Sequence, residues 1–368
     1  MKLECLKDKL KEIINLTDKI SGRNLSLPIL STVLLEAKKK SLVIKSTNLE
    51  IGLEVEIPAK VEIEGIVAVN ANVLMSYLNN LSKEDKVSLE VKDGNLHINT
   101  ESSKSVIKGF NSEDFPIIPK INQENGFEIS ADTFLNGIQS VSFASTSSDI
   151  KPEISSVYLY NKNNEIIFVG TDSFRLAEKT IKVNNFDSPN FGLIIPFKSI
   201  SDLVRVLGLI GQDKILVSYN KNQIAVQTDN IYLTLRIIDG SYPDYNQIIP
   251  TDFKTELNIK KEDLVGLLKL ASVFSDRFNQ IDLNIKSKED LIHINSYNQD
   301  VGENKTSFAT KIKGDSLDIS FNAKYLIDCL NSFSDNVVNL RFTEVNKPLM
   351  IEGVSDYSFR YLVMPVNR

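Results

Sequence analysis

The residues with the clearest capacity for chemistry in this 368-residue chain lie together in residues 170–177, which read GTDSFRLA. This stretch brings the hydroxyl of Ser173, the carboxylate of Asp172 and the cation of Arg175 within four residues. A hydrolase or transferase uses such groups as nucleophile, base and anion clamp. The same mixture is also typical of a turn between two strands, and of the wall of a binding groove. Which of the three interpretations holds depends on the elements that position the stretch.

Two histidines and two cysteines are the other candidates for chemistry. His97 and His293 each lie in an alternating run typical of a strand face (NLHINT and LIHINS). Cys5 and Cys329 are far apart and form neither a CxxC metal pair nor a disulfide framework, so we expect two buried, reduced thiols. None of the motifs GxxxxGK[ST], GxGxxG, GxSxG or HExxH occurs. The sequence therefore predicts no catalytic set, no metal site and no cofactor.

The composition limits the class of protein. Hydrophobic residues make up 42% and charged residues 24% of the chain, which is typical of a globular protein. Its apolar runs are far shorter than the roughly 20 residues of a spanning helix, and the first residues contain no signal-peptide core, so we expect a cytoplasmic protein. A net charge of −6 argues against a protein that grips nucleic acid with its whole surface. One basic face on an acidic body remains compatible with it.

A segment made of a strand, a hinge and an amphipathic helix occurs three times. It reads GIVAVNANVLMSYLNNL from residue 65, GLIIPFKSISDLVRVLG from residue 192 and LDISFNAKYLIDCLNSF from residue 317. The hinge residues Asn70, Pro196 and Asn322 follow one another at intervals of 126 residues. Apolar residues recur four and eight positions after each hinge, on one helical face: Leu74 and Leu78, Ile200 and Val204, Leu326 and Leu330.

The sequence around each copy repeats as well. Each third opens with a strand and another amphipathic helix, and alternating runs separated by turn residues follow the repeated segment. A period of 126 residues exceeds the about 20–50 residues of solenoid repeats and matches a whole domain. We therefore predict an α+β chain of three tandem domains, each with two helices packed on antiparallel sheets: residues 1–121, 122–249 and 250–368.

Several cations lie on the repeated helices or in predicted loops. Lys198 and Arg205 are seven residues apart, on one face of the middle helix. Arg23, Lys151 and Arg277 lie in segments that we predict to be loops. If equivalent helices of the three domains face one way, these cations form a basic surface within an acidic body.

Five phrases carry a likeness to a known family: LPILSTVLLEA (27–37), KPEISSVYLY (151–160), GTDSFRLA, GSYPDYNQIIP (240–250) and YLVMPVNR (361–368). With them, the whole chain resembles the bacterial sliding clamp family, the beta subunit of the replicative DNA polymerase III. The resemblance implies a homodimer that joins head to tail into a ring of six domains around duplex DNA. Helices would line the hole, and the ring would hold the alpha-type polymerase subunit on DNA without any catalytic activity of its own.

The resemblance also implies a hydrophobic groove between the second and third domains. In the family, this groove captures short peptides of the polymerase, the clamp loader and other proteins with a clamp-binding motif. Thr171, Arg175 and Leu176 match the phrase that forms one wall. The other implied groove residues are Ile154, Ser173, Phe174, Pro243, Gln247, Ile248, Leu349, Met364, Pro365, Val366, Asn367 and Arg368. Apolar members would bind anchor side chains, and polar members would orient the peptide.

Three groove positions depart from the family pattern. Ser173 and Phe174 stand where the family usually has glycine followed by histidine or tyrosine, and Gln247 stands where arginine often occurs. Glycine adopts a positive φ more readily than serine does. The groove also loses one cation at Gln247 and one polar ring edge at Phe174. We therefore expect a peptide preference that differs from that of relatives.

For the ring itself, the resemblance implies two further sets of residues. Contacts to DNA phosphates, without base readout, are expected from Arg23, Asn24, Lys151, Lys198, Arg205 and Arg277. The seam, meaning the contact between two copies, is expected to join an edge strand at residues 104–110 of one copy to the third domain of the other. Its expected residues are Lys104, Val106, Lys108, Val273 and Phe274.

Two other classes of function fit parts of the sequence. A hydrolase or transferase built on Asp172, Ser173 and Arg175 would lose turnover on Asp172→Asn, whereas an apolar groove would tolerate that change. A multidomain scaffold or adhesion protein would be expected to carry a secretion signal and disulfides, which the sequence lacks. The repeat favours a groove over a catalytic site, because the other two copies have no comparable polar turn.

Overall fold

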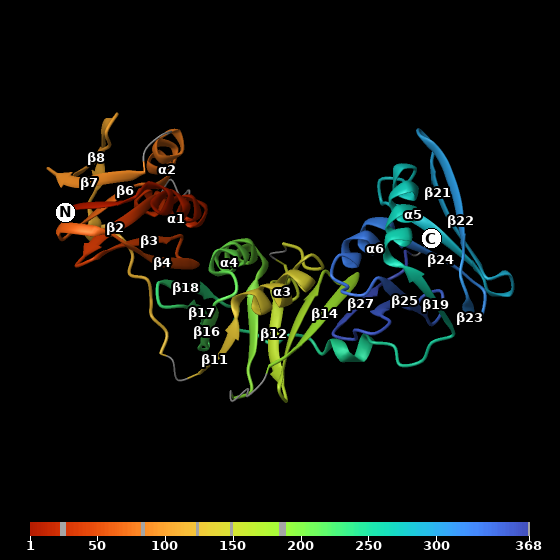
Figure 1. Cartoon of the computed structure of the whole chain (residues 1–368). Coiled ribbons are helices and arrows are strands. Elements are labelled where there is room, and N and C mark those ends of the chain that lie inside the picture. The colour runs from red at the N-terminus through yellow and green to blue at the C-terminus, as the bar shows by residue number, and fades with distance from the viewer. Residues whose placement is uncertain (23–26, 82–84, 123–124, 148–149, 184–188, 367–368) are drawn as a thin grey trace. The chain divides into compact units, whose positions relative to one another are not determined.

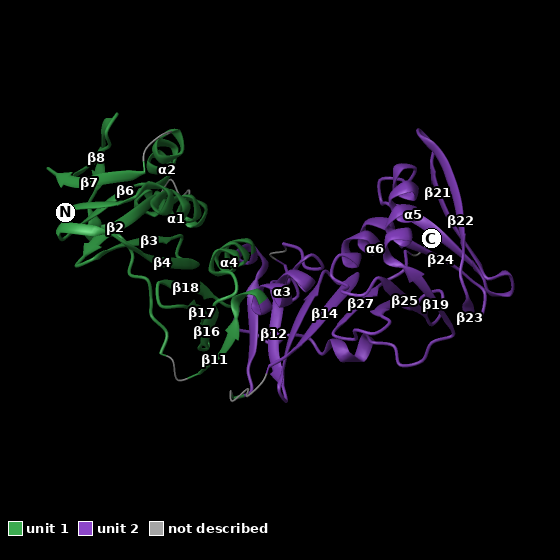
Figure 2. Cartoon of the chain, viewed as in Figure 1, with its two compact units in different colours: residues 1–132, 187–189, 201–237 green, residues 133–186, 190–200, 238–368 purple. Residues whose placement is uncertain are grey.

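The computed structural model describes residues 1–22, 27–81, 85–122, 125–147, 150–183 and 189–366 (Figure 1). Four predicted site residues lie outside these ranges: Arg23, Asn24, Asn367 and Arg368. The chain forms two compact units, each of which is described by itself (Figure 2). Unit 1 comprises residues 1–132, 187–189 and 201–237, and unit 2 comprises residues 133–186, 190–200 and 238–368.

Every α-helix of the described chain follows directly on a β-strand. The pairs are β1 (Lys2–Leu6) with α1 (Lys7–Ile20), β6 (Gly65–Asn70) with α2 (Ala71–Asn80), β11 (Gly126–Ser130) with α3 (Ala131–Ser142), β15 (Gly192–Pro196) with α4 (Phe197–Ile210), β19 (Thr255–Lys260) with α5 (Lys261–Val273), and β24 (Leu317–Asn322) with α6 (Ala323–Leu330). Helices α2, α4 and α6 begin at Ala71, Phe197 and Ala323, 126 residues apart. The predicted repeat of strand, hinge and helix is therefore confirmed.

The hinge residues begin their helices by capping them. The side chain of Asn70 accepts a hydrogen bond from the backbone N–H of Val73 at 3.0 Å. The side chain of Asn322 accepts from the backbone N–H groups of Lys324 and Tyr325 at 2.9 and 3.3 Å. Asparagine in this position satisfies N–H groups that have no partner inside the helix. These two hinges are asparagines for this reason.

The helices are short and depend on packing for their stability. Helices of 8–14 residues are marginal in isolation, so the buried apolar face has to hold them in place. Leu74, Leu78, Leu326 and Leu330 are fully buried, as the periodicity predicts. In α4, Ile200 is buried and Val204 is half-buried.

Unit 1 contains two antiparallel sheets. The smaller has the order β5 (Lys60–Ile63), β1, β7 (Lys86–Lys92), β8 (Asn95–Asn99), β9 (Lys104–Ile107). The larger has the order β10 (Gly109–Phe110), β6, β2 (Thr32–Lys38), β3 (Ser41–Thr47), β4 (Ile51–Pro58), β18 (Ile231–Arg236), β17 (Gln223–Gln227), β16 (Lys214–Tyr219), β11. Two short 3₁₀ helices, η1 (Pro28–Ser31) and η2 (Ser112–Asp114), lie in its connections. Because β4 pairs with β18, the first and central copies share one sheet.

Unit 2 has the corresponding arrangement. Its larger sheet has the order β15, β12 (Ser156–Lys162), β13 (Glu165–Thr171), β14 (Arg175–Lys182), β27 (Phe359–Val363), β26 (Leu349–Gly353), β25 (Val337–Phe342), β19, β23 (Ile312–Gly314). Its smaller sheet has the order β22 (Gly302–Ala309), β21 (Leu291–Asn298), β20 (Gln280–Lys286), β24. The 3₁₀ helices η3 (Tyr245–Ile248) and η4 (Ser287–Glu289) complete it. Here β14 pairs with β27, which joins the central and third copies in one sheet.

The prediction of a single edge strand at residues 104–110 was wrong in its extent. Strand β9 is at the edge of the smaller sheet but ends at Ile107, while β10 pairs with β6 in the larger sheet. The chain changes sheets through Gly109, which packs against the backbone of Gly94. A Cβ at this position would lie 1.9 Å from the carbonyl oxygen of Gly94, so a larger residue would not fit. Residues 104–110 are therefore divided between two sheets, with glycine required at the second strand.

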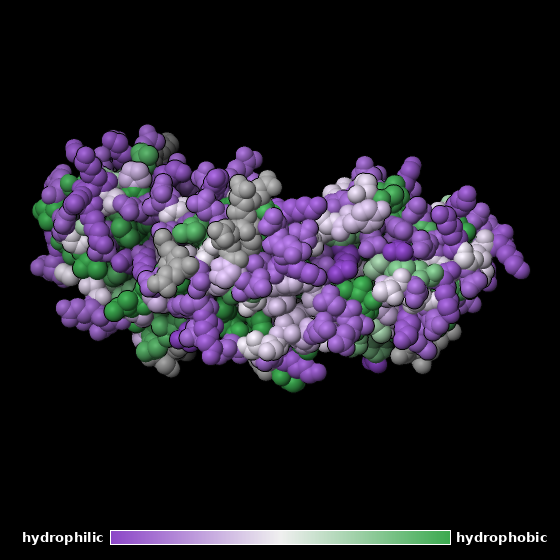
Figure 3. Space-filling view, turned by 90° about the horizontal axis from the view of Figure 1, so that it is seen from below, coloured by the Kyte–Doolittle hydropathy of each residue, from purple (hydrophilic) through white to green (hydrophobic). Residues whose placement is uncertain are grey.

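The two cysteines are buried, as expected. Cys5 is 4% exposed and Cys329 is fully buried, and both are free thiols. Burial raises the pKa of Cys5 to about 12, so the thiol stays protonated and unreactive. None of the helices in the described part of the chain has the length and apolar character to cross a membrane. The molecular face in Figure 3 is mostly hydrophilic, with hydrophobic side chains in small separate groups.

Candidate functional site

The GTDSFRLA stretch is a turn between two strands. Strand β13 ends at Thr171, β14 begins at Arg175, and Thr171 pairs with Leu176 across the hairpin. The Thr171 hydroxyl donates to the carbonyl of Arg175 at 2.5 Å and accepts from the backbone N–H of Ser173 at 3.1 Å. The Asp172 carboxylate accepts from the N–H groups of Phe174 and Arg175, both at 3.0 Å. The side chains of Thr171 and Asp172 therefore close the turn.

Arg175 is held between two carboxylates. Its Nε donates to Asp172 at 2.9 Å and its Nη1 donates to Asp328 of α6 at 2.8 Å. The guanidinium carbon lies 4.2 Å from the centre of the Tyr325 ring, and the side chain is only 10% exposed. Burial by itself would lower the pKa of Arg175, but the hydrogen bonds to Asp328 and Asp172 raise it overall. The cation predicted to orient a peptide thus also fastens the turn to α6.

This geometry weighs against the hydrolase or transferase interpretation. If Asp172 were the general base for Ser173, one of its carboxylate oxygens would have to lie within reach of the serine hydroxyl. The Asp172 carboxylate instead accepts two backbone N–H groups and the Arg175 Nε. Among the described residues, no group of three or more His, Cys, Asp or Glu side chains is arranged to hold a metal ion.

Ser173 has the backbone conformation that glycine would favour. Its φ is +76°, in the left-handed region where a Cβ is disfavoured. The turn therefore keeps the shape that a glycine would allow, although serine occupies the position. Phe174, the next residue, is 62% exposed and directs a large apolar side chain to the surface beside the turn.

A groove of about 770 Å³ lies next to this turn within unit 2. It is lined by the turn and the start of β14, by the linker that follows β18, and by the loop between β25 and β26 with the end of β27. Eight predicted groove residues line it: Thr171, Ser173, Phe174, Arg175, Leu176, Gln247, Ile248 and Met364. The GTDSFRLA segment is therefore both a turn between two strands and part of the groove wall.

Other predicted groove residues do not line this groove. Ile154 is half-buried, Pro243 is exposed, and Leu349 is fully buried in β26. Pro365 and Val366 follow β27, where the backbone N–H of Val366 donates to the carbonyl of Ser320 at 2.8 Å.

Several lining residues were missed by the sequence reasoning. They are Ile249, Pro250, Thr251, Asp252, Phe253, Lys254, Thr343, Glu344, Asn346, Lys347, Pro348, Leu362 and Val363. Residues 249–254 directly follow Ile248, which was predicted to line the groove. Their position next to it in the sequence could therefore have identified them. The loop at residues 343–348 carries no such signal, because only the pairing of β14 with β27 and β26 brings it near the turn.

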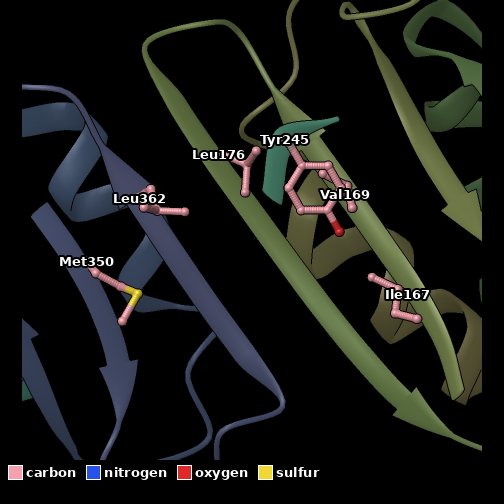
Figure 4. Close-up of a cluster of buried hydrophobic side chains, with 6 residues drawn as sticks. All are labelled: Ile167, Val169, Leu176, Tyr245, Met350 and Leu362. Carbon is pink, nitrogen blue, oxygen red and sulfur yellow. The ribbon is translucent and has the colours of Figure 1, made fainter. Parts of the chain in front are cut away.

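A cluster of buried hydrophobic side chains lies beneath the groove (Figure 4). Its members are Ile167, Val169, Leu176, Tyr245, Met350 and Leu362. Leu176, Leu362 and Met350 stand opposite one another on β14, β27 and β26, so they form one row on one face of the sheet. Leu176 and Leu362 also line the groove, so its floor is continuous with the core.

The rim of the groove is apolar and exposed. Phe174 is 62%, Ile248 is 56% and Met364 is 39% exposed. At one end, Lys254 and Glu344 form an ion pair at 2.8 Å, and this hydrogen bond lowers the pKa of Glu344. A concave apolar surface with exposed anchors and a few polar groups is suited to binding the apolar side chains of a partner.

The described cations of the predicted DNA set are exposed. Lys151 precedes β12, Lys198 lies on α4, and Arg277 lies in the turn after α5 with its guanidinium 4.7 Å from the Phe278 ring centre. Arg205 of α4 is 47% exposed and is paired with Asp202 at 2.5 Å, which partly neutralises it.

The residues predicted for the seam are also at the surface. Lys104, Val106 and Lys108 are exposed on or next to β9, Val273 is exposed at the end of α5, and Phe274 is half-buried. Further exposed hydrophobic residues lie on α5, in the turn after it and at the β21–β22 hairpin: Leu270, Phe278, Tyr297 and Val301. The third copy thus exposes more apolar surface than the two predicted residues provide.

Comparison with known proteins identifies the family. Residues 1–119, 128–244 and 246–367 match the N-terminal, central and C-terminal domains of the DNA polymerase III beta subunit. The chain belongs to the DNA polymerase III beta subunit family. The prediction of a DNA sliding clamp built from three tandem clamp domains is confirmed at this level.

Relatives of this clamp match over the full length. The Beta sliding clamp of Synechococcus elongatus is 26% identical over 100% of this chain and 99% of that protein. The crystal structure of the DNA polymerase sliding clamp of Bacillus subtilis is 25% identical, with a TM-score of 0.95 over 100% of this chain and 99% of that one. The DNA polymerase III subunit beta of Pseudomonas aeruginosa is 22% identical and shows the same fold, with a TM-score of 0.94 over 100% of both chains.

Proposed function

We propose that this sliding clamp closes with a second copy into a ring around duplex DNA and tethers partner proteins through the groove beside the GTDSFRLA turn. The partners are the alpha-type polymerase subunit, the clamp loader and other proteins with a clamp-binding motif. The observation that carries the docking role is the exposed rim of Phe174, Ile248 and Met364 over an apolar floor. The clamp acts in the cytoplasm, on chromosomal DNA, and has no catalytic activity of its own.

The chemistry of the groove supports a short apolar segment as its ligand. Apolar anchors bind by removing their own surface and that of the rim from water, which contributes about 25 cal/mol per Å². The side chains of Thr171, Asp172 and Arg175 already have hydrogen-bond partners within the protein, so they require none from a ligand. Binding energy would therefore concentrate in a few buried anchor side chains.

The ring part of the proposal follows from the family and from the surface residues. Lys151, Lys198, Arg205 and Arg277 would face DNA phosphates, and the outer surface would carry the net negative charge. Binding through phosphates alone is weak and sensitive to salt, which suits a clamp that slides. The exposed β9 edge of one copy would join the third domain of the other, in a dimer with two identical seams.

The proposed domain limits are residues 1–121, 122–249 and 250–368. They fall in the segments between β10 and β11 and between β18 and β19, away from any regular strand. Limited proteolysis is expected to cleave within these segments before it cleaves within the sheets.

Retention on circular DNA tests the ring. The clamp, placed on nicked circular plasmid DNA by a clamp loader, should co-elute with the plasmid in gel filtration and be lost when a restriction enzyme linearises it. Retention on both forms, or on neither, would contradict a ring. In parallel, light scattering at micromolar concentration should give twice the chain mass of 41.3 kDa. A mass near that of one chain would contradict the dimer.

A further inference from the structure

We propose that Tyr245 is a positioning residue of the groove: its hydroxyl, fixed by Glu178 and Arg360, sets where Gln247 and Ile248 stand and thereby controls the affinity for an apolar peptide. This inference rests on the proposed docking function of the groove. It concerns residues that lie behind the wall and are not themselves lining residues.

The Tyr245 hydroxyl is part of a buried hydrogen-bond network. It donates to Oε2 of Glu178 at 2.5 Å and lies 2.8 Å from the hydroxyl of Tyr160. Glu178 is 6% exposed, and Arg360 holds it in two ways, with Nε 2.7 Å from Oε1 and Nη2 donating to Oε2 at 3.0 Å. A buried carboxylate is tolerated only when such partners compensate for the loss of water. Each of the two Glu178 oxygens therefore has a partner.

The network joins three segments that are distant in sequence. Glu178 lies on β14 of the central copy, and Arg360 stands directly opposite it on β27 of the third copy. Tyr245 begins η3, in the linker that connects those copies. The phenol therefore fastens the linker to the strand pair that joins the central and third copies.

The groove wall depends on this fastening because little else of η3 is buried. Asn246, Gln247 and Ile248 are exposed, whereas Tyr245 is 7% exposed and belongs to the cluster under the groove. A single 3₁₀ turn has poor hydrogen-bond geometry and little stability of its own. Ile248 lies three residues after Tyr245, so it lies above Tyr245 in this turn. A shift of the phenol moves Ile248 with it.

The state of the phenol suits this role. Burial, together with the adjacent Glu178 carboxylate, raises the pKa of Tyr245 far above its usual range. The hydroxyl thus stays protonated and remains a donor to Glu178 at any physiological pH.

The test compares two buried phenols that differ in their relation to the groove. Tyr245→Phe removes the hydroxyl at the wall. Tyr232→Phe is the matched control, because Tyr232 is 8% exposed and its hydroxyl bonds the carbonyl of Pro119 and the N–H of Ile121, both at 3.0 Å, within unit 1. Binding is measured by fluorescence anisotropy with a fluorescein-labelled peptide, Gly-Ser-Leu-Ser-Leu-Phe-Gly.

We expect Tyr245→Phe to weaken peptide binding about tenfold, the effect of losing one charge-assisted hydrogen bond. Tyr232→Phe should leave the affinity unchanged, although it should lower the melting temperature about as much as Tyr245→Phe does. The backbone amides of Gln247, Ile248 and Ile249 should exchange with solvent faster in Tyr245→Phe and not in Tyr232→Phe. This exchange separates a moved wall from a general loss of stability.

The outcomes distinguish the two proposals. Equal affinities of the wild-type chain and Tyr245→Phe would overturn the inference alone. Failure of the wild-type chain to bind the peptide would contradict the docking function, and the inference would fail with it. If Tyr245→Phe does not fold, Tyr160→Phe removes the neighbouring hydroxyl and should weaken binding about threefold. An unchanged affinity in that variant would overturn the inference equally.

Discussion

Two linkers join the repeated domains, one between β10 and β11 and one between β18 and β19. Their sequences are similar, but they form different surfaces. The first contains Phe115-Pro116 followed at once by Ile117-Ile118-Pro119, and the second contains Tyr242-Pro243 and later Ile248-Ile249-Pro250. In the first linker, Ile118 and Ile121 are 6% and 8% exposed and pack against Ala225 and Tyr232. Ile118 and Ile121 thus fill the space beside their sheet, whereas the neighbouring Ile117 is 94% exposed.

The second linker leaves space beside its sheet. Ile248 is exposed and Ile249 only partly buried, and both line the groove. The difference in sequence is four residues, Asp244 to Gln247, which stand between the aromatic-proline pair and the Ile-Ile-Pro phrase. These residues include most of η3 and contribute Tyr245 as its anchor. A short insertion with one buried phenol thus accompanies the change from a filled contact to an open groove.

The largest test of this comparison is the stability cost of each isoleucine. Ile118→Ala should lower the free energy of unfolding by about 2–5 kcal/mol, because it empties a packed site. Ile249→Ala, at the matching position of the second Ile-Ile-Pro phrase, should lower it by only about 1 kcal/mol, because Ile249 is only partly buried. Urea unfolding followed by circular dichroism measures both. Equal costs would mean that the two linkers are not packed differently.

The next largest effect is on binding and concerns the rim. Phe174→Ala and Ile248→Ala should each weaken binding of the labelled peptide about tenfold or more, as expected for anchor contacts. Ile63→Ala is the control, since Ile63 is 58% exposed in unit 1 and does not line the groove. An equal loss of affinity in the control would show that the effect is not specific to the second linker and its turn.

The GTDSFRLA turn offers a smaller, stabilising test. Ser173→Gly should raise the free energy of unfolding by about 0.5–1 kcal/mol, because glycine adopts φ near +76° without a Cβ penalty. Asn163, at the other end of β13, has φ of +55°. Asparagine tolerates this region better, so Asn163→Gly should gain less. A gain at Asn163 equal to or above that at Ser173 in thermal unfolding would contradict the assignment of strain to Ser173.

The smallest effect is a difference in pH response between the linkers. The first linker caps η2 with Asn111, which does not titrate, and the second caps η3 with Asp244. Hydrogen bonds from Gln247 and Asn246 lower the pKa of Asp244 below its ordinary 3.8. The cap is therefore fully present above pH 3.8 and is lost as the pH falls through the lowered pKa.

Carbon NMR of the side chains would measure this response. The Asp244 carboxyl carbon should titrate below pH 3.8, and the amides of η3 should shift with it. In Asp244→Asn, the acid-induced shift of η3 should disappear. A midpoint at or above the ordinary value would contradict the cap.

Much of the fold was predictable because the repeat is regular. The 126-residue spacing located α2, α4 and α6, and the buried leucines follow the expected helical face. The division of the strand at 104–110 was not predictable, since β9 pairs with β8 in one sheet and β10 pairs with β6 in the other. Periodicity reports local structure and carries no information about such a contact.

The candidate site was predicted only in part. The turn and the Gln247-Ile248 wall are contiguous phrases, so a family resemblance identifies them. The partners of Arg175 show the limit, because Asp172 is three residues away whereas Asp328 is 153 residues away. The loop at residues 343–348 reaches the groove only through the order of strands in the sheet. Long-range pairing of this kind has no local signature.

The pairing of β14 with β27 has a mechanical consequence. Five residue pairs, from Arg175 with Val363 to Lys179 with Phe359, join the central and third copies, and five from Ile231 with Val55 to Leu235 with Ile51 join the first and central copies. A force that pulls two copies apart along these strands meets their backbone hydrogen bonds in shear, and all must yield together. In the proposed ring, each of these two joints within a chain would therefore resist separation through its whole row of paired residues at once.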